Sequence, residues 1–197
     1  MRHKGVHAVE KDTETEIGGD AGARAVTSEA LPLCFYGEVT GASVMRLQYE
    51  LMARLAKQPG ARLPLFMASP GGSMIPAIAF WEFVTLQKIE LDITTLAVGS
   101  SASMVILAAG IHRRASSTSR FLLHPTSLGL HGRSYLNDLK RDVRFGEIDE
   151  ERYLKILAVT TGHSLEKIRE LAHAHTYLTA QEAKELGLIH EVLEIMG

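Results

Sequence analysis

Short apolar segments alternate with longer amphipathic segments along most of this chain, and that alternation restricts the possible folds more than any other feature of the sequence. Residues at helical spacing, such as Val44, Leu47 and Leu51, separate the apolar runs. The apolar runs have the length of strands and cover residues 33–36, 63–68, 91–98, 120–124 and 188–193. Strands that alternate with helices favour a largely parallel sheet with right-handed crossovers. The sequence therefore predicts an α/β fold.

Composition narrows the class of protein further. The chain has 197 residues, of which 46% are hydrophobic and 22% are charged, so it can build one domain with an ordinary core. A net charge of −2 argues against nucleic-acid binding that depends on bulk positive charge. The longest apolar run, near residues 105–111, is far shorter than the roughly 20 residues that a membrane span needs. The single cysteine, Cys34, excludes an internal disulfide and a cysteine metal cluster. We expect a cytoplasmic protein with no nucleic-acid or membrane partner.

Residues 1–30 differ from the remainder of the chain. They carry six acidic and four basic residues and almost no large apolar ones, so they cannot bury enough surface to offset the entropy of ordering. We expect this segment to be flexible, either as a gate or docking arm or as a solvated tail. It lacks the apolar stretch of a secretory signal. Residues 31–197 then form the folded domain.

The longest predicted helix covers about residues 134–159, with Ser134 as its cap. A helix of this length spans roughly 40 Å, because each residue adds 1.5 Å along the axis. That is longer than a small domain needs, so we expect the helix to contact a partner.

Three loops that follow predicted strands carry the residue types that acyl transfer uses. Residues 69–73 (Ser-Pro-Gly-Gly-Ser) can expose backbone N–H groups to a carboxylate, a phosphate or a developing oxyanion, although a plain tight turn uses the same residues. Residues 99–104 (Gly-Ser-Ser-Ala-Ser-Met) place a serine hydroxyl where a strand passes into a helix, a pattern that close packing of small residues also produces. His124, at the end of its strand, is either a general base or a structural capping histidine. Together the loops supply a nucleophile, a base and a two-donor oxyanion site, which is the set that acyl transfer requires.

The chain resembles the family of the Clp protease proteolytic subunit, ClpP, from about residue 33 to residue 193. Residues 69–72 are similar to the family's S-P-G-G loop and residues 99–104 to its G-x-x-A-S-M segment; further similar segments are residues 119–125, 161–168 and 177–189. Each segment is common by itself, but the five in this order are specific. The resemblance implies the ClpP/crotonase-like α/β fold, a repeated β-β-α spiral, in which the helix over about 134–159 is the handle that joins two stacked heptameric rings.

The resemblance also implies an activity and a site. Ser103 would be the nucleophile, His124 the general base, and the backbone N–H groups of Gly72 and Met104 the oxyanion hole. The protein would be a serine endopeptidase subunit of a self-compartmentalised barrel that cleaves unfolded polypeptide. A separate AAA+ unfoldase would deliver the substrate. We expect no metal and no cofactor in this chain, because ATP would act only through the unfoldase.

One departure from the family concerns the third member of the triad. The family has an aspartate where this chain has His175. The aspartate holds the base in one tautomer and stabilises the imidazolium, whereas a neutral histidine can accept the hydrogen bond but brings no negative charge. His175 is therefore a working third member, a reduced one or a relic. If His175 orients His124, the substitution His175→Asp should raise activity.

Two other functions stay open. A catalytically impaired ClpP-like subunit with an assembly or regulatory role is the main alternative, because the triad aspartate is missing. A crotonase-like acyl-CoA enzyme would share the fold, but the pairing of Ser103 with His124 argues against it, because such enzymes rely on carboxylates. Residues 1–30 show no clear match to the family's axial loops, so docking to an unfoldase is less secure than the fold.

Overall fold

A computed structural model describes residues 31–129 and 135–195. In chain order its elements are β1 (Leu33–Tyr36), α1 (Gly41–Lys57), β2 (Leu63–Ser69), α2 (Met74–Leu86), β3 (Leu91–Ser100), α3 (Ser103–Ala108), β4 (His112–Ser116), β5 (Arg120–Leu122), α4 (Leu136–Thr161), α5 (Leu165–His173), β6 (Tyr177–Thr179), α6 (Ala180–Glu185) and β7 (Glu191–Leu193). The segment 1–30, for which we predicted flexibility, and the predicted cap Ser134 lie outside the described residues.

The sheet is largely parallel, as the alternation of strands and helices predicts. Its strand order is β1-β2-β3-β4-β7, and each of these neighbours pairs in parallel. The last residues of β3, which follow those that pair with β4, pair in parallel with β5. The strand β6 in turn pairs with β5 and is antiparallel to it. The α/β fold class is therefore confirmed. A complete β-β-α order within the described ranges occurs at β4-β5-α4.

Two strands of this sheet do not follow from the apolar pattern. The strand β4 has the sequence His-Arg-Arg-Ala-Ser, and it is buried because Arg113 satisfies its guanidinium with backbone carbonyls, among them Leu188 O at 2.8 Å and Gly110 O at 3.1 Å. Hydrogen-bonded in this way, a charged side chain can occupy the interior. The other unpredicted strand, β6, is only three residues long.

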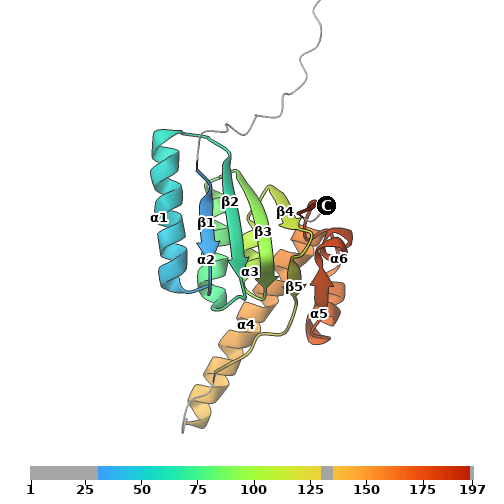
Figure 1. The fold of residues 1–197 in the computed structure, drawn as a ribbon. Coiled ribbons are helices and arrows are strands. Elements are labelled where there is room, and N and C mark those ends of the chain that lie inside the picture. The colour runs from blue at the N-terminus through green and yellow to red at the C-terminus, as the bar shows by residue number, and fades with distance from the viewer. Residues whose placement is uncertain (1–30, 130–134, 196–197) are drawn as a thin grey trace, which may run out of the picture.

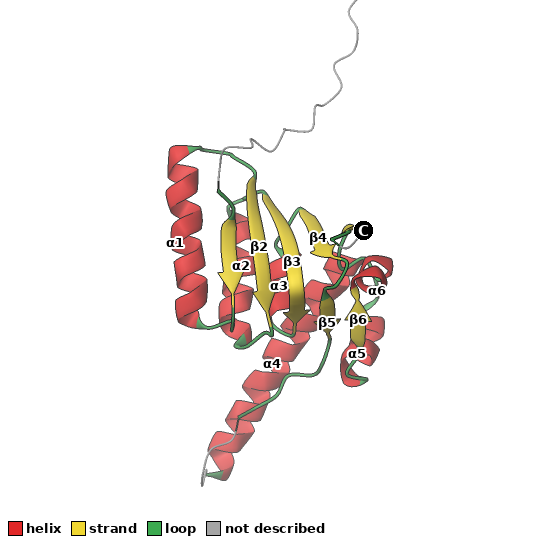
Figure 2. Ribbon diagram, viewed as in Figure 1, coloured by secondary structure: helices red, strands yellow, loops and turns green. Residues whose placement is uncertain are grey.

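Helices cover the sheet unequally. Figure 2 shows α2, α3 and one end of α4 behind the strands, with the other end of α4 projecting away from the body. The helix α4 buries Tyr153, Leu154 and Leu157 near its C-terminus, whereas Leu136 and Val143 near its N-terminus are exposed. It ends at Gly162, which takes the left-handed conformation with φ 73°. The predicted long helix is thus present, but only its C-terminal half belongs to the core (Figure 1).

None of the helices in the described part of the chain has both the length and the apolar character that crossing a membrane requires.

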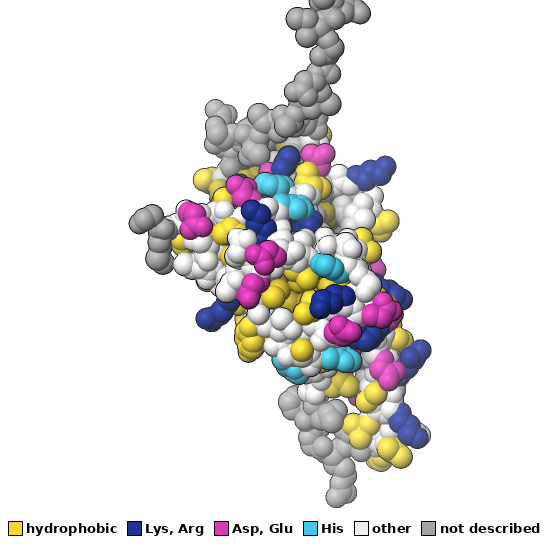
Figure 3. Space-filling model, turned by 90° about the vertical axis from the view of Figure 1, so that its right-hand side faces the viewer, with side chains coloured by type: hydrophobic (Ala, Val, Ile, Leu, Met, Phe, Trp, Pro, Cys, Tyr) yellow, Lys and Arg dark blue, Asp and Glu magenta, His cyan; other side chains and the backbone are white. Residues whose placement is uncertain are grey.

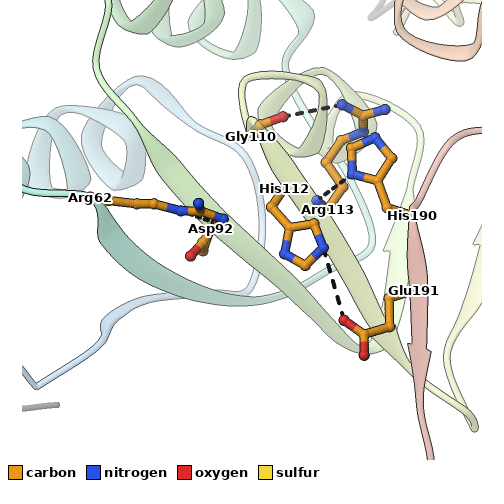
Figure 4. Close-up of polar contacts among 7 residues, drawn as sticks. All are labelled: Arg62, Asp92, Gly110, His112, Arg113, His190 and Glu191. Carbon is orange, nitrogen blue, oxygen red and sulfur yellow. Dashed lines mark hydrogen bonds and ion pairs between the residues drawn. The ribbon is translucent and has the colours of Figure 1, made fainter. Parts of the chain in front are cut away.

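At the amino ends of the parallel strands, side chains connect neighbouring segments (Figure 4). Arg62 binds the buried carboxylate of Asp92 through Nε at 2.8 Å. His190 accepts the backbone N–H of Arg113 at Nδ1 (3.1 Å), and its ring stacks on His112 with centroids 5.7 Å apart. These contacts attach the segment before β7 to β4.

Candidate functional site

The carboxyl ends of β2, β3 and β5 bring the three predicted loops together. Ser69 of β2 pairs with Gly99 of β3, and Gly99 pairs with Phe121 of β5, so the three residues form one row across the sheet. The chain leaves all three strands in the same direction, because the strands are parallel. The loops that follow therefore lie side by side.

A cleft of about 350 Å³ opens where these loops meet. Its lining comes from the strand-end loops, from the start of α2, from the segment after β5 and from α4. The lining residues are Gly72, Ser73, Met74, Ile75, Ser101, His124, Pro125, Thr126, Ser127, Leu128, Asp142, Phe145, Gly146 and Asp149. Three serines and the predicted base His124 thus share one concave site, and the predicted nucleophile Ser103 is not part of its lining.

Ser101 is one of three serines that line the cleft, with Ser73 and Ser127, and it alone of the three lies within residues 99–104. It lies between β3 and α3 with φ 55°, a left-handed conformation that is uncommon for a residue with a side chain. Its backbone N–H donates to Leu122 O at 3.0 Å, which attaches it to the end of β5. Its half-buried hydroxyl has no hydrogen bond to any residue within 31–129 and 135–195. This geometry resembles a nucleophile elbow, in which a sharp strand-to-helix turn presents the hydroxyl.

Ser103, the predicted nucleophile, lies elsewhere. It is completely buried, and its Oγ lies 2.7 Å from Ser100 O and 3.1 Å from Ser69 O. The hydroxyl therefore fastens the start of α3 to the end of β2 and is closed to a substrate. This burial does not favour the predicted role of Ser103, which stays a prediction, and Ser101 is a second candidate that the sequence analysis did not single out. Its signal was present, since residues 99–104 contain three serines.

Gly71 and Gly72 approach the cleft as closely as the sequence predicts. Their φ angles are 104° and 140°. A Cβ on Gly71 would lie 2.6 Å from Ser101 Cβ and 2.8 Å from Ser100 O, so only glycine fits beside this serine.

Gly72 also keeps a backbone donor free for an oxyanion. Val39 N–H donates to Gly71 O and Ser73 N–H donates to Val39 O, both at 2.8 Å. These bonds leave the N–H of the exposed Gly72 without a partner among the described residues. Gly72 thus suits the predicted role.

Met104 does not supply the second donor. Its N–H donates to Ser101 O at 3.0 Å, inside the turn that begins α3, and the residue is completely buried. The N–H of Ala102 follows Ser101 directly and has no hydrogen bond in the described ranges. Ala102 is equally buried, but its N–H is a second candidate donor beside the predicted Met104, two residues earlier in the chain.

His124 lies half-buried at the cleft, and its Nδ1 is 2.7 Å from Pro125 O. A hydrogen bond between His124 and Ser101 is not formed in this structure, although both line the cleft. Hydrogen bonds between a base and its nucleophile are often long before substrate binds.

His175 is brought against His124 but does not hydrogen-bond to it. The two rings stack with centroids 6.3 Å apart and an angle of 14° between their planes. Nδ1 of His175 is 3.3 Å from His173 O. The hydrogen bond expected of a third triad member is therefore absent between these two described residues. The prediction that His175→Asp raises activity presupposes that bond.

Charged side chains of both signs are mixed on one face of the molecule (Figure 3). Figure 3 shows basic and acidic side chains interspersed on one face, with no broad region of a single sign.

Comparison with known proteins shows similarity over the part of the chain that forms the sheet and the cleft. Residues 24–196 match the family model described as Clp protease. The ATP-dependent Clp protease proteolytic subunit 3 of Rhodococcus jostii (strain RHA1) is 32% identical over 161 residues, which cover 80% of this chain and 78% of that protein. The match spans the three loops, the cleft and α4.

Proposed function

This chain belongs to the Clp protease family, and on that premise we propose that it is a serine peptidase whose nucleophile is Ser101. One observation carries the proposal. Ser101 and His124 line one cleft with Gly72, and neither the Ser101 hydroxyl nor the Gly72 N–H has a hydrogen-bond partner among the described residues.

The proposed reaction needs only groups of this chain and water. His124 Nε2 takes the proton of Ser101 as Oγ attacks the carbonyl carbon of the scissile peptide bond. The N–H groups of Gly72 and Ala102 donate to the oxyanion of the tetrahedral intermediate. The imidazolium then protonates the leaving amine, and the C–N bond breaks to leave an acyl-enzyme. Water, deprotonated by His124, hydrolyses the ester and restores Ser101.

The proposed assembly is a barrel of two stacked heptameric rings, joined through α4. The exposed N-terminal half of α4 supports this part of the proposal, because Leu136, Val143 and Phe145 are 66%, 49% and 57% exposed in the single chain. Polypeptide unfolded by an AAA+ unfoldase would be the substrate, and ATP would be used by that partner. A cytoplasmic location belongs to the same proposal.

An impaired subunit with an assembly or regulatory role is the second candidate. The observation that favours it is His175, which occupies the position of the family's aspartate and makes only a ring contact with His124.

The kinetics of two serine variants test which serine is the nucleophile. We expect Ser101→Ala to lower kcat on an unstructured peptide by about 10⁴-fold or more, the size of loss that follows removal of a triad member. Ser103→Ala removes an equally small hydroxyl two residues away and should keep most of kcat, at a cost of about 1 kcal/mol in the free energy of unfolding.

The opposite pattern would refute the assignment. If Ser103→Ala were inactive but folded and assembled, while Ser101→Ala kept its rate, Ser103 would be the nucleophile. A wild-type oligomer without peptidase activity at any pH would favour the impaired subunit.

A further inference from the structure

Within residues 31–129 and 135–195 no charged side chain binds Nδ1 of the proposed base His124, and a backbone carbonyl occupies that place. His124 Nδ1 lies 2.7 Å from the carbonyl oxygen of Pro125. A carbonyl oxygen can only accept a hydrogen bond, so Nδ1 carries the proton. Nε2 then keeps the lone pair with which a general base acts.

The same peptide group is held at its other end by a carboxylate. The planar unit that joins Pro125 to Thr126 contains the Pro125 C=O and the Thr126 N–H. Thr126 N–H donates to Oε2 of Glu150 on α4 at 2.7 Å. Hydrogen bonds that share one amide polarise each other, so an ionised Glu150 strengthens the acceptor that His124 meets.

We propose that Glu150 is a positioning residue that stands in for the missing triad aspartate and acts on His124 through the Pro125–Thr126 peptide group. The inference rests on the proposed function of Ser101 and His124. Glu150 keeps the carbonyl aimed at Nδ1, and its negative charge favours the imidazolium that forms as Ser101 is deprotonated. The proline supports the arrangement, because its ring fixes φ and restricts the residue before it to an extended conformation.

The other ionisable groups around His124 do not offer this connection. Asp142 and Asp149 line the cleft but pair with arginines of α4. His175 meets the ring face to face at 6.3 Å. Among the described residues, the only hydrogen bond of the His124 ring is the one that Nδ1 donates to Pro125 O.

Glu150 itself is suited to a charged role. Its side chain is 20% exposed, and its second oxygen lies 3.6 Å from Nε2 of His173. Its other oxygen accepts the Thr126 N–H, and hydrogen bonds of this kind are stronger when the acceptor is a carboxylate.

The variant Glu150→Gln, made in the full chain, tests the inference. The amide can still accept the hydrogen bond of Thr126 but has no charge. We expect kcat to fall by about 10- to 100-fold with little change in KM, comparable to the loss of an outer partner of a functional histidine. The acid limb of the pH–rate profile should move to lower pH, because the imidazolium loses a nearby negative charge.

Two control variants separate this effect from general changes. Glu147→Gln makes the same substitution on an exposed residue of α4 that pairs with Arg144. His173→Ala removes the other contact of Glu150. Both should keep the wild-type kcat and acid limb. A Glu150→Gln enzyme with an unchanged acid limb would overturn the inference, whether or not its kcat falls, because a purely structural loss would not alter the titration of the base.

A measurement that does not use activity separates the inference from the proposed function. Solid-state NMR of the wild-type protein labelled with ¹⁵N-histidine, with His124→Gln for assignment, should show neutral His124 protonated at Nδ1. Protonation at Nε2 would overturn the inference even if Ser101 is the nucleophile. If the protein has no peptidase activity, the proposed function fails, and the tautomer still decides whether this chain of hydrogen bonds exists.

Discussion

Gly71 and Ser101 approach each other more closely than two residues with side chains allow. The φ of Gly71 is 104°, and a Cβ there would lie 2.6 Å from Ser101 Cβ. The loop before α2 and the turn before α3 therefore depend on each other. The position of Ser101, the proposed nucleophile, is set as much by the glycine as by its own backbone.

The variant Gly71→Ala should show this dependence. We expect the free energy of unfolding to fall by about 1–3 kcal/mol from backbone strain, and kcat/KM to fall by about 100-fold because Ser101 is displaced. Gly37→Ala is the matched control, since Gly37 has φ 94° but no atom within 4 Å of an added Cβ. Peptide hydrolysis and urea denaturation measure both effects. An equal loss of activity in the two variants would contradict the account.

The sequence predicts the loop that holds the proposed nucleophile Ser101 but favours Ser103 within it, and the reason is an irregularity in β3. The pairing of β2 with β3 runs from Met67–Thr95 directly to Ser69–Gly99, and Ala97 inside this interval has φ 56°. The strand continues to Ser100 rather than ending at residue 98, so Ser101 is the first residue of the turn. A bulge of this kind depends on the partner strand, and a pattern of apolar residues does not reveal it.

At the scale of elements, β7 depends on a histidine that must stay neutral. Nδ1 of His190 accepts the N–H of Arg113, so protonation there would break the contact shown in Figure 4. Burial, together with the positive charge of Arg113 and the neighbouring His112, lowers the pKa of His190 below its ordinary 6.5. Glu191 lies 3.9 Å from His112 and pairs with that ring when it is charged.

The lowered pKa of His190 predicts acid sensitivity. Above about pH 6.5 this histidine is neutral in the folded and the unfolded chain, so its contribution to stability is complete. As pH falls below that value, the unfolded chain binds the proton more readily, and the free energy of unfolding decreases. His190→Asn keeps an acceptor for Arg113 and should flatten this decrease. His163→Asn, on an exposed residue, should not. Urea denaturation as a function of pH compares them, and equal slopes for all three proteins would contradict the prediction.

Elements whose apolar residues face one side are predictable from the sequence, and elements held by polar contacts are not. The helix α1 follows from Val44, Leu47 and Leu51, all of which are buried. The strand β4 does not, because its interior position rests on the hydrogen bonds of Arg113 to carbonyls far along the chain. Such partners exist only after the chain has folded.

At the scale of the whole molecule, one half of α4 is buried in the core and the other half is exposed. Its C-terminal half packs on α3 and α5, while its N-terminal half projects from the body (Figure 1). The length of the helix is predictable from the sequence. Which part leaves the body is not, because the helix is amphipathic throughout and the boundary is set by the elements against which it packs.

Assembly through α4 predicts a matched pair of phenotypes. Val143→Glu places a charge on the projecting half and should dissociate stacked rings, because the exposed valine would lie in the interface. Val159→Glu makes the same change near the other end of α4, where the residue is 81% exposed, and should leave assembly intact. Sedimentation velocity reports the mass of the oligomer. The same mass for both variants and the wild type would contradict a ring contact through this half of α4.

The account as a whole depends on Ser101 as the residue that reacts. Its most direct test is to treat the wild-type protein with a fluorophosphonate and locate the adduct by tandem mass spectrometry, since Ser101 and Ser103 give distinguishable fragments. We predict the adduct on Ser101 Oγ, with its loss when His124 is replaced by alanine. An adduct on Ser103, or no adduct on an assembled protein that carries an intact Ser101, would contradict the account.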